Sequence, residues 1–296
     1  MLDFRVNTFL TVCENGNYTK VAEKLGLTQP AVTQHIKYIE DRYKIKLFIK
    51  DGKTMRLTPE GSLLREMFIT LSSDCKKIDR CIKKMNDESK ALLMGVTKSI
   101  GEYVMPNILQ KYLETNPSVR ISMDVENTAY LLDYLKQGTI DFCIIGGKFN
   151  KNAYWHKLFS REKFVCLCSS SNPLAGKSAD IEQLFGERLF LRENGSGSRE
   201  ILKSSLNQLG YNESNFKTVT EIGSIDVIKR LVKNGLGITF MYEAAALKEI
   251  KSGSLAVINV KDFDISHEFD FVCLKNSMFI DEFDGFFDFA VKNRVD

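Results

Sequence analysis

The sequence predicts an α/β protein that begins with a small winged helix-turn-helix unit and continues through a long linker helix into a two-lobed domain. Three observations support this prediction. The first 58 residues contain short amphipathic helices and a hairpin, residues 64–85 hold a regular apolar seam, and strand-like and helical runs alternate from residue 91 onward. Alternation of strands and helices over about 200 residues is typical of an α/β fold with largely parallel sheets.

The N-terminal residues predict three packed helices. The apolar residues of the first helix are Val6, Phe9, Leu10, Val12 and Cys13. Between residues 16 and 43, two further helices meet at Gly26, a residue type that ends helices in the left-handed conformation. We expect Thr19 to cap the first of these two helices and Thr28 to cap the second, in which Pro30 occupies the first turn.

The last of these helices has one apolar and one polar face. Its apolar residues recur at spacings of four and three, which predicts a buried stripe of Val32, Ile36, Ile39 and Tyr43. The opposite face carries amide, hydroxyl and ammonium groups from Gln29, Thr33, Gln34 and Lys37. Such groups read base edges and phosphates when a helix lies in the major groove. A helical hairpin with a solvated face explains the same pattern, and the next two segments favour DNA reading.

Residues 47–61 predict a β-hairpin beside the helices. Strands over Leu47–Lys50 and Met55–Thr58 flank Asp51-Gly52, a dipeptide typical of hairpin turns. The basic edge of this wing consists of Lys50, Lys53 and Arg56. The edge suits DNA phosphates, although lysines on a solvated hairpin also serve solubility.

A long helix is predicted over residues 59–88, where Thr58 and Pro59 provide a cap and a first-turn proline. Its apolar residues follow at spacings that alternate between four and three, in the order Leu64, Phe68, Leu71, Cys75, Ile78, Ile82 and Met85. That regularity is typical of a coiled-coil seam rather than of a helix on the surface of one domain. We therefore predict a dimerisation helix, since two reading helices at a fixed separation match a two-fold operator.

The chain of 296 residues is long enough for two or three domains. We expect the winged helix-turn-helix at residues 1–58, the linker helix at 59–89 and the α/β domain at 90–296. Within the last, lobe I is expected near 90–162 and 266–296, and lobe II near 163–265.

Two strand-to-helix turns of the α/β domain suit a small anion. One is Thr97-Lys98-Ser99, and the other is RENGSGSR at residues 192–199. Both offer hydroxyls and free backbone N–H groups at a helix N-terminus, at the carboxyl ends of strands where ligands of open α/β folds bind. Glycine and serine also occur in such turns only because they allow a tight backbone turn, without any ligand. The candidate ligand residues in these turns and before two later helices are Thr97, Lys98, Ser99, Thr128, Arg192, Ser196, Ser198, Arg199 and Ser224.

Charge and composition favour a cytoplasmic nucleic-acid-binding protein. Residues 1–90 hold 17 Lys and Arg against 12 Asp and Glu, whereas the remainder holds 24 against 26. A basic N-terminal unit beside a near-neutral remainder fits contact with nucleic acid at one end. With 44% hydrophobic residues, the sequence contains no apolar run long enough for a bilayer and no secretory signal at its start.

Cysteine usage and motifs argue against a metal site and an enzyme. The seven cysteines form no C-x-x-C motif and the three histidines are not clustered with them, so we expect neither disulfides nor bound metal. Cys143, Cys166, Cys168 and Cys273 lie in apolar runs and are expected to be buried. The chain has no G-x-S-x-G, phosphate loop or dinucleotide fingerprint, so no catalytic residue or cofactor is predicted. A solute-binding protein is the alternative, but such a protein needs export.

Over essentially the whole chain, the sequence resembles the LysR-type transcriptional regulators. The specific part of the match is FLTVCENGNYTKVAEKLGLTQPAVTQHIKYIE, followed by LF and RLTPEG. Looser landmarks follow in order: MPNIL, NP before Val119, GTIDFCIIGG, NPL, RENGSGSR and GLGITF. The resemblance implies a DNA-binding dimer or tetramer joined by the linker helix. It also implies an effector domain like a periplasmic solute-binding protein, with the ligand between two lobes and RNA polymerase as a further partner.

Carried onto this chain, the resemblance implies DNA contacts by Thr28, Gln29, Pro30, Ala31, Thr33, Gln34 and Lys37. The family often has arginine where this chain has Gln34, followed by glutamine where it has His35. Glutamine prefers adenine and arginine prefers guanine, so the operator bases cannot be copied from relatives. His35 either points to DNA or covers the core.

In the effector domain, the positions that match ligand residues of the family are Thr97, Ser99, Thr128, Gly146, Arg192, Ser196, Ser198 and Ser224. RENGSGSR is similar to the branch of the family that regulates carbon fixation and sulfur assimilation. This similarity implies a small anionic metabolite as the effector.

Overall fold

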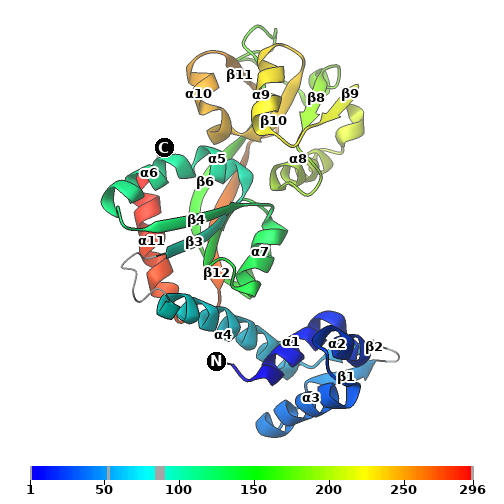
Figure 1. Cartoon of the computed structure of the whole chain (residues 1–296). Coiled ribbons are helices and arrows are strands. Elements are labelled where there is room, and N and C mark those ends of the chain that lie inside the picture. Colours follow the sequence, from blue (N-terminus) through cyan, green and yellow to red (C-terminus); the bar gives the residue numbers. More distant parts are fainter. Residues whose placement is uncertain (1, 52–53, 84–90, 295–296) are drawn as a thin grey trace.

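The computed structural model describes residues 2–51, 54–83 and 91–294, with no side chain described at 50, 51 and 54. Figure 1 shows a small N-terminal unit, one long helix leading away from it, and a larger domain whose two lobes are stacked end to end. The predicted order of winged helix-turn-helix, linker helix and two-lobed α/β domain is confirmed.

The N-terminal unit packs α1 (Phe4–Asn15), α2 (Tyr18–Leu25) and α3 (Gln29–Tyr43) around one apolar core. The buried side chains of this core are Val6, Phe9, Val12, Val21, Ala22, Val32, Ile36, Ile39, Leu47 and Phe68. Gly26 ends α2 with a φ of 66°, a left-handed conformation that costs glycine little. The Thr28 hydroxyl accepts a hydrogen bond from the Ala31 N–H at 3.3 Å and caps α3, as predicted.

Two details predicted for these helices are wrong. Asn17, not Thr19, caps α2, because its side chain accepts hydrogen bonds from the N–H groups of Thr19 and Lys20 at 2.8 and 3.2 Å. Tyr43 is 48% exposed rather than buried. It is the last residue of α3 and extends past the apolar core, after which Lys44 turns the chain with a φ of 54°.

The wing is an antiparallel hairpin of β1 (Phe48–Asp51) and β2 (Thr54–Leu57). After it, the Thr58 hydroxyl accepts a hydrogen bond from the Gly61 N–H at 2.9 Å. This bond caps helix α4 (Pro59–Lys83) and fixes its first turn against the winged unit.

The α/β domain joins its strands in one hydrogen-bonded network, in the order β4-β3-β5-β12-β6-β10-β8-β9. The strands are β3 (Ala91–Val96), β4 (Arg120–Val125), β5 (Phe142–Ile145), β6 (Tyr154–Ser169), β7 (Ser178–Ala179), β8 (Arg188–Leu191), β9 (Thr218–Glu221), β10 (Ile238–Tyr242), β11 (Leu255–Val260) and β12 (Ile265–Leu274). The α-helices are α5 (Lys98–Tyr103), α6 (Met105–Thr115), α7 (Thr128–Gln137), α8 (Gly197–Gln208), α9 (Ile225–Lys233), α10 (Leu247–Lys251) and α11 (Ile280–Asn293).

The long strands β6 and β12 run through both lobes and join them (Figure 1). Within lobe I, β3 pairs in parallel with β4 and β5, and within lobe II, β8 pairs in parallel with β9 and β10. The central pairs β12–β5, β12–β6 and β6–β10 are antiparallel. The prediction of largely parallel sheets is therefore wrong at the centre, because β6 leaves lobe I and β12 returns to it. The predicted lobe borders near 162 and 266 fall inside or beside these strands and remain a prediction.

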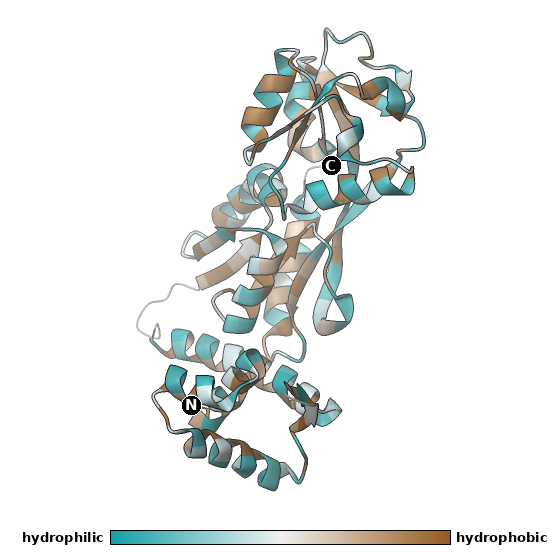
Figure 2. Ribbon diagram, turned by 90° about the vertical axis from the view of Figure 1, so that its right-hand side faces the viewer, coloured by the Kyte–Doolittle hydropathy of each residue, from teal (hydrophilic) through white to brown (hydrophobic). Residues whose placement is uncertain are grey.

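Apolar side chains fill the interior of both lobes. Figure 2 shows brown segments along the strands, and alternating teal and brown bands on the helices that cover them. In lobe I, the Phe142 ring stacks on that of Phe271 with centroids 4.7 Å apart, and α11 adds Phe286 at 5.1 Å. The four cysteines predicted to be interior, at positions 143, 166, 168 and 273, are all buried.

Candidate DNA interface and effector cleft

The exposed face of α3 presents the side chains assigned to DNA from the sequence. Thr28, Gln29, Pro30, Thr33, Gln34 and Lys37 are exposed, and Ala31 is half-buried. The Gln29 amide donates to the Thr33 hydroxyl at 3.0 Å, which holds these two side chains together on the first turns of the helix. Amide, hydroxyl and ammonium groups on one outward helix face are what base edges and phosphates of a major groove require.

His35 packs toward the neighbouring helix α1. Its Nδ1 lies 3.0 Å from the Thr8 hydroxyl, and its ring meets the edge of the Phe4 ring with centroids 5.0 Å apart. The side chain is half-buried. These contacts favour the alternative in which His35 covers the core.

A second group of basic side chains lies beside α3, and the sequence analysis missed it. The Arg5 guanidinium sits 4.0 Å over the Tyr38 ring, and Arg42 donates to the Tyr38 hydroxyl at 3.5 Å. Arg5 belongs to α1, so only the packing of α1 on α3 brings these residues together. On the wing, Arg56 is exposed, whereas Lys53 and the side chain of Lys50 lie outside the described residues and keep their roles as predictions.

Helix α4 buries different faces along its length. Leu64 and Phe68 pack into the core of the winged unit, with the Phe68 and Phe9 ring centroids 5.9 Å apart. Polar Thr70, Asp74 and Lys77 are buried, and their side chains bond to residues of lobe I. The apolar side chains left exposed or half-buried on α4 include Leu63, Met67, Leu71, Cys75, Ile78 and Ile82.

Two residues of the predicted dimer seam are therefore not available for pairing. Leu64 and Phe68 are unavailable to a second chain because the winged unit already covers them. Leu71, Cys75, Ile78 and Ile82 are exposed or half-buried, as are Leu63 and Met67 nearer the start of the helix, and their role in pairing stays a prediction. Met85 lies outside the described residues.

The cleft between the lobes brings together turns from both halves of the domain. Its lining residues are Thr97, Lys98, Ser99, Asn127, Gly146, Gly147, Arg192, Ser196, Gly197, Ser198 and Tyr242. The open space among them is about 20 Å³, which is room for roughly one water molecule. The two lobes are thus closed on one another at this cleft, whereas a second interlobe pocket of about 730 Å³, lined by residues that include Tyr103, Asp226 and Lys229, stays open.

Hydrogen bonds across the cleft hold the lobes in this closed arrangement. Two run from Lys98 Nζ to the Gly223 carbonyl at 2.6 Å and from the Tyr242 hydroxyl to the Gly146 carbonyl at 2.8 Å. Outside the cleft lining, the Tyr103 hydroxyl donates to Asp226 Oδ1 at 2.8 Å. Each bond joins a residue of lobe I to one of lobe II. Opening the cleft therefore requires these groups to find other partners or water.

Two cations, Lys98 and Arg192, lie at the cleft. Arg192 is buried and donates two hydrogen bonds to Glu193, at 2.8 and 2.9 Å. Burial acts to raise the pKa of Glu193, but the hydrogen bonds from Arg192 keep that pKa below its usual value, so the two groups form an ion pair. An anion in the cleft would meet a guanidinium, an ammonium and the hydroxyls of Ser196 and Ser198.

Three of the predicted ligand residues, Thr128, Arg199 and Ser224, do not line the cleft, and the last two bond elsewhere in lobe II. The Arg199 guanidinium turns away from it and binds Glu213 at 3.0 Å and Glu221 at 2.5 Å. The Ser224 hydroxyl accepts a hydrogen bond from the Val227 N–H at 3.4 Å and caps α9. Two carboxylates thus bind the Arg199 guanidinium, and Ser224 lies outside the cleft lining, so we no longer assign either residue to the effector.

Thr128 lies directly behind the cleft. A Cβ atom built on Gly147 would overlap the Thr128 hydroxyl, so the glycine is what allows the two segments to approach. The hydroxyl is buried and has no hydrogen-bond partner among the described residues. A buried polar group in this state is costly and marks a position where a ligand or water would be stabilised.

Several cleft residues escaped the sequence analysis. Gly147 and Gly197 approach so closely that a Cβ on Gly197 would lie 3.2 Å from the Gly147 Cα. The glycines in the motifs IIGG and GSGSR are the sequence features that could have indicated this close approach. Tyr242 ends β10 and points across the cleft to Gly146. Asn127 lies at the N-cap position of α7, where asparagine is common in any helix, so the sequence did not mark it as a cleft residue.

Other kinds of site find no support in the parts of the chain that the structure describes. Within residues 2–51, 54–83 and 91–294, no group of three or more histidine, cysteine, aspartate or glutamate side chains could hold a metal ion. None of the helices in these ranges is both long and apolar enough to cross a membrane.

Known proteins resemble the chain over most of its length. It is 28% identical to an uncharacterized HTH-type transcriptional regulator of Methanocaldococcus jannaschii, over 87% of this chain and 88% of that one. It is 28% identical to a probable RuBisCO transcriptional regulator of Cyanidium caldarium, over 84% and 80% of the two chains. The HTH-type transcriptional regulator CysL of Bacillus subtilis is 26% identical, over 90% and 89%.

Solved structures share the fold. OxyR of Corynebacterium glutamicum superimposes with a TM-score of 0.62 at 22% identity, over 98% of this chain and 91% of that one. The CcmR regulatory domain of Synechocystis, solved in complex with 2-PG, gives a TM-score of 0.61 at 21% identity, over 69% and 97%. Full-length BenM gives 0.59 at 20% identity, over 99% and 96%.

Family models match both parts of the chain. The model described as "Bacterial regulatory helix-turn-helix protein, lysR family" matches residues 5–62, which hold the outward face of α3 and the wing. The model described as "LysR substrate binding domain" matches residues 86–293, which hold the closed cleft. The chain therefore belongs to the LysR family of transcriptional regulators, DNA-binding proteins whose activity is modulated by a small metabolite bound in the effector domain.

Proposed function

We propose that two copies of α3 read a two-fold operator and that the interlobe cleft binds a small anionic metabolite. The observation that carries this proposal is the convergence of Lys98, Arg192 and the hydroxyls of Thr97, Ser196 and Ser198 on one closed cleft. The effector can regulate DNA binding only through different affinities for two arrangements of the protein.

Two chains are proposed to pair through the apolar stripe of α4. Its members are Leu63, Met67, Leu71, Cys75, Ile78 and Ile82, and they stay exposed or half-buried in a single chain. Self-pairing of an apolar helix stripe is the usual way in which such residues leave water. Pairing α4 with α4 fixes the spacing of the two reading helices on DNA.

A mobility-shift assay on the intergenic DNA beside the protein's own gene tests the proposed operator binding. We expect retarded complexes whose affinity falls steeply as salt rises, because neutralised phosphates release counterions. A scrambled fragment of equal length is the control. Failure to bind any fragment from that region, or binding indifferent to salt, would contradict the proposal.

Gln34→Ala is expected to change the sequence preference of the protein at one operator position. An exposed glutamine that contacts adenine through two hydrogen bonds contributes about 1–3 kcal/mol of discrimination. Competition shifts with operator variants measure this change. Gln110→Ala is the matched control, because Gln110 is exposed on α6 and donates to Glu114 at 3.0 Å, away from the reading face. If Gln34→Ala and Gln110→Ala show the same operator preference, Gln34 does not contact the DNA bases.

Ser198→Ala is expected to weaken anion binding about tenfold while DNA affinity in the absence of effector stays unchanged. The Ser198 side chain is buried at the cleft. Calorimetry of the full chain with 2-PG, phosphate and sulfate measures the effect, and 2-PG is the first probe because it occupies the related CcmR domain. Ser205→Ala is the control, because the Ser205 hydroxyl donates to the Ile201 carbonyl within α8 at 2.9 Å. If none of these oxyanions binds the wild-type protein, the anionic class of effector is wrong.

The proposal extends to the cellular setting. A regulator of this kind acts in the cytoplasm, where bacterial operators lie, and its bound dimer or tetramer contacts RNA polymerase at the promoter. No catalytic role is proposed for any residue.

A further inference from the structure

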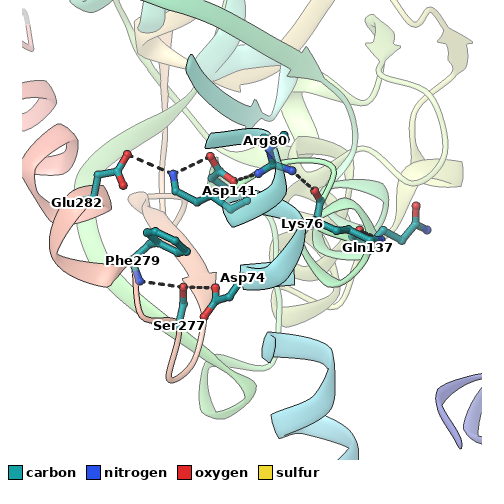
Figure 3. Close-up of polar contacts among 10 residues, drawn as sticks. Asp74, Lys76, Arg80, Gln137, Asp141, Ser277, Phe279 and Glu282 are labelled. Carbon is teal, nitrogen blue, oxygen red and sulfur yellow. Dashed lines mark hydrogen bonds and ion pairs between the residues drawn. The ribbon is translucent and has the colours of Figure 1, made fainter. Parts of the chain in front are cut away.

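Polar side chains of helix α4 bond to lobe I (Figure 3). The Asp74 carboxylate accepts a hydrogen bond from the Ser277 hydroxyl at 2.6 Å and one from the Met278 N–H at 2.9 Å. One turn earlier, the Thr70 hydroxyl donates to the Lys275 carbonyl at 2.9 Å. These bonds tie the middle of α4 to the loop that follows β12.

The second half of this contact centres on Asp141, which is 8% exposed. Its carboxylate accepts from Lys77 Nζ at 3.1 Å and from the Arg80 guanidinium on the next turn of α4. Lys77 also donates to Glu282 of α11 at 3.2 Å, and Arg80 donates to the Gly138 carbonyl at 2.7 Å. We call the set Asp74, Lys77, Arg80, Asp141 and Ser277 the α4 dock.

The α4 dock is held by directional bonds, and Lys77 Nζ also lies 5.0 and 4.7 Å from the ring centroids of Phe279 and Phe283. Ile69 is the residue of α4 that joins the apolar cluster of lobe I formed around Leu131 and Val272. Polar surfaces can be rehydrated when they separate, so interfaces of this composition permit relative motion. A buried charge is nevertheless costly without partners, so Lys77 at 6% exposure depends on the carboxylates of Asp141 and Glu282, of which Asp141 is the buried one.

Asp141 also begins the strand that ends at the effector cleft. It directly precedes β5, whose four residues are all buried and span about 13 Å. β5 is fixed between β3 and β12. At its far end, Gly146 lines the cleft, donates its N–H to the Thr97 hydroxyl at 3.2 Å and accepts the bond from Tyr242. One short, rigid strand therefore joins the α4 dock to the cleft.

We propose that Asp141 is a positioning residue that couples the closure of the effector cleft to the docking of α4 on lobe I. The Tyr242 hydroxyl restrains Gly146 at one end of β5, while Lys77 and Arg80 restrain Asp141 at the other end of the same strand. By thermodynamic linkage, undocking of α4 must loosen the cleft to the same extent. The inference rests on the proposed function, because it names the path by which the effector reaches the reading helices.

Hydrogen-exchange mass spectrometry on the full-length protein tests this coupling in both directions. Asp141→Asn removes the charge at the α4 dock, and we expect exchange to rise about threefold or more both in residues 70–80 and in residues 142–147 and 192–199 of the cleft. Tyr242→Phe removes one hydroxyl at the cleft, and we expect faster exchange in residues 70–80 of the distant helix. Residues 29–43 should keep wild-type exchange in both variants.

The controls separate coupling from a merely structural role. Asp133→Asn breaks an exposed ion pair with Lys136 in the same lobe and should leave all these segments unchanged. If the Asp141→Asn variant does not fold, the Arg80→Gln variant is used in its place, because Asp141 then retains its hydrogen bond from Lys77. Changes confined to α4 and residues 138–141, or a Tyr242→Phe variant with wild-type exchange in α4, would overturn the inference. None of these readouts uses DNA, so a failed mobility shift is a separate result.

Discussion

Phe142→Ala is expected to destabilise lobe I by about 3–5 kcal/mol. The Phe142 side chain is fully buried in β5, stacked on Phe271, with Phe286 at 5.1 Å and Phe283 at 5.8 Å between ring centroids. Hydrogen bonds to β3 and β12 hold β5 on both sides, so the backbone cannot move in to fill the space. The variant therefore loses both the transfer free energy of the ring and the packing around the cavity.

Urea unfolding followed by the fluorescence of Trp155 measures this loss. Trp155 is the single tryptophan of the chain, and its ring meets that of Phe271 with centroids 6.2 Å apart, so its signal reports lobe I. Tyr130→Ala on α7 is the control, because Tyr130 is 58% exposed and its truncation should change stability by about 0.5 kcal/mol or less. Equal unfolding midpoints for the two variants would rule out the predicted cavity.

Gly61→Ala and Gly285→Ala are expected to change stability in opposite directions, although both place alanine in a helix. At Gly61, in the first turn of α4, a Cβ would overlap the carbonyl oxygen of Leu47, which is backbone and cannot rotate away. Displacing α4 from the winged unit should cost about 1–3 kcal/mol, more than alanine gains in helix propensity. At Gly285, in α11, nothing lies within 4 Å of the added Cβ, so alanine should stabilise by about 0.5–1 kcal/mol.

Hydrogen exchange resolved by segment measures each effect where it occurs. Gly61→Ala should speed exchange in residues 47–68 and reduce affinity for operator DNA, since the start of α4 sets the angle of the winged unit. Gly285→Ala should slow exchange in residues 280–293 and leave DNA affinity at the wild-type value. A Gly61→Ala protein as stable as wild type would show that the contact with Leu47 relaxes freely.

Local signals explain why the N-terminal unit could be predicted from the sequence. Gly26 and Thr28 act on their own neighbours along the chain, so the turn, the cap and the outward face of α3 follow from short-range geometry. The cap of α2 was misplaced by two residues, because Asn17 and Thr19 are both good capping types and only the side-chain bonds decide between them. Arg5 and Tyr38 could not be paired from sequence, since their contact depends on how α1 crosses α3.

Helix α4 shows what apolar periodicity leaves out. Thr70, Asp74 and Lys77 follow one another at spacings of four and three, the same spacing as the predicted seam, yet they are the residues that α4 buries against lobe I. Polar side chains at such spacing are normally read as a solvated face. Their partners, among them Asp141 and Ser277, lie far away in the sequence, so no local pattern predicts the contact.

The effector cleft was predicted in outline and corrected in detail. Thr97, Ser99 and Ser196 line it because strand-to-helix turns meet at the carboxyl ends of parallel strands, a rule of the fold. Arg199 belongs to the same turn, but its side chain finds two glutamates inside lobe II. The direction of a long side chain depends on such neighbours, which sequence spacing does not reveal.

The closed cleft has a consequence for how strongly an effector can bind. If the metabolite binds in this cleft, as proposed, a space of about 20 Å³ is too small for it, so binding requires molecules in which the lobes have parted. The apparent dissociation constant is the intrinsic one divided by that fraction, and an open population of about 1% weakens apparent affinity about a hundredfold. Under the proposed function, the bonds from Lys98 to Gly223 and from Tyr242 to Gly146 would help set the metabolite concentration at which the gene responds.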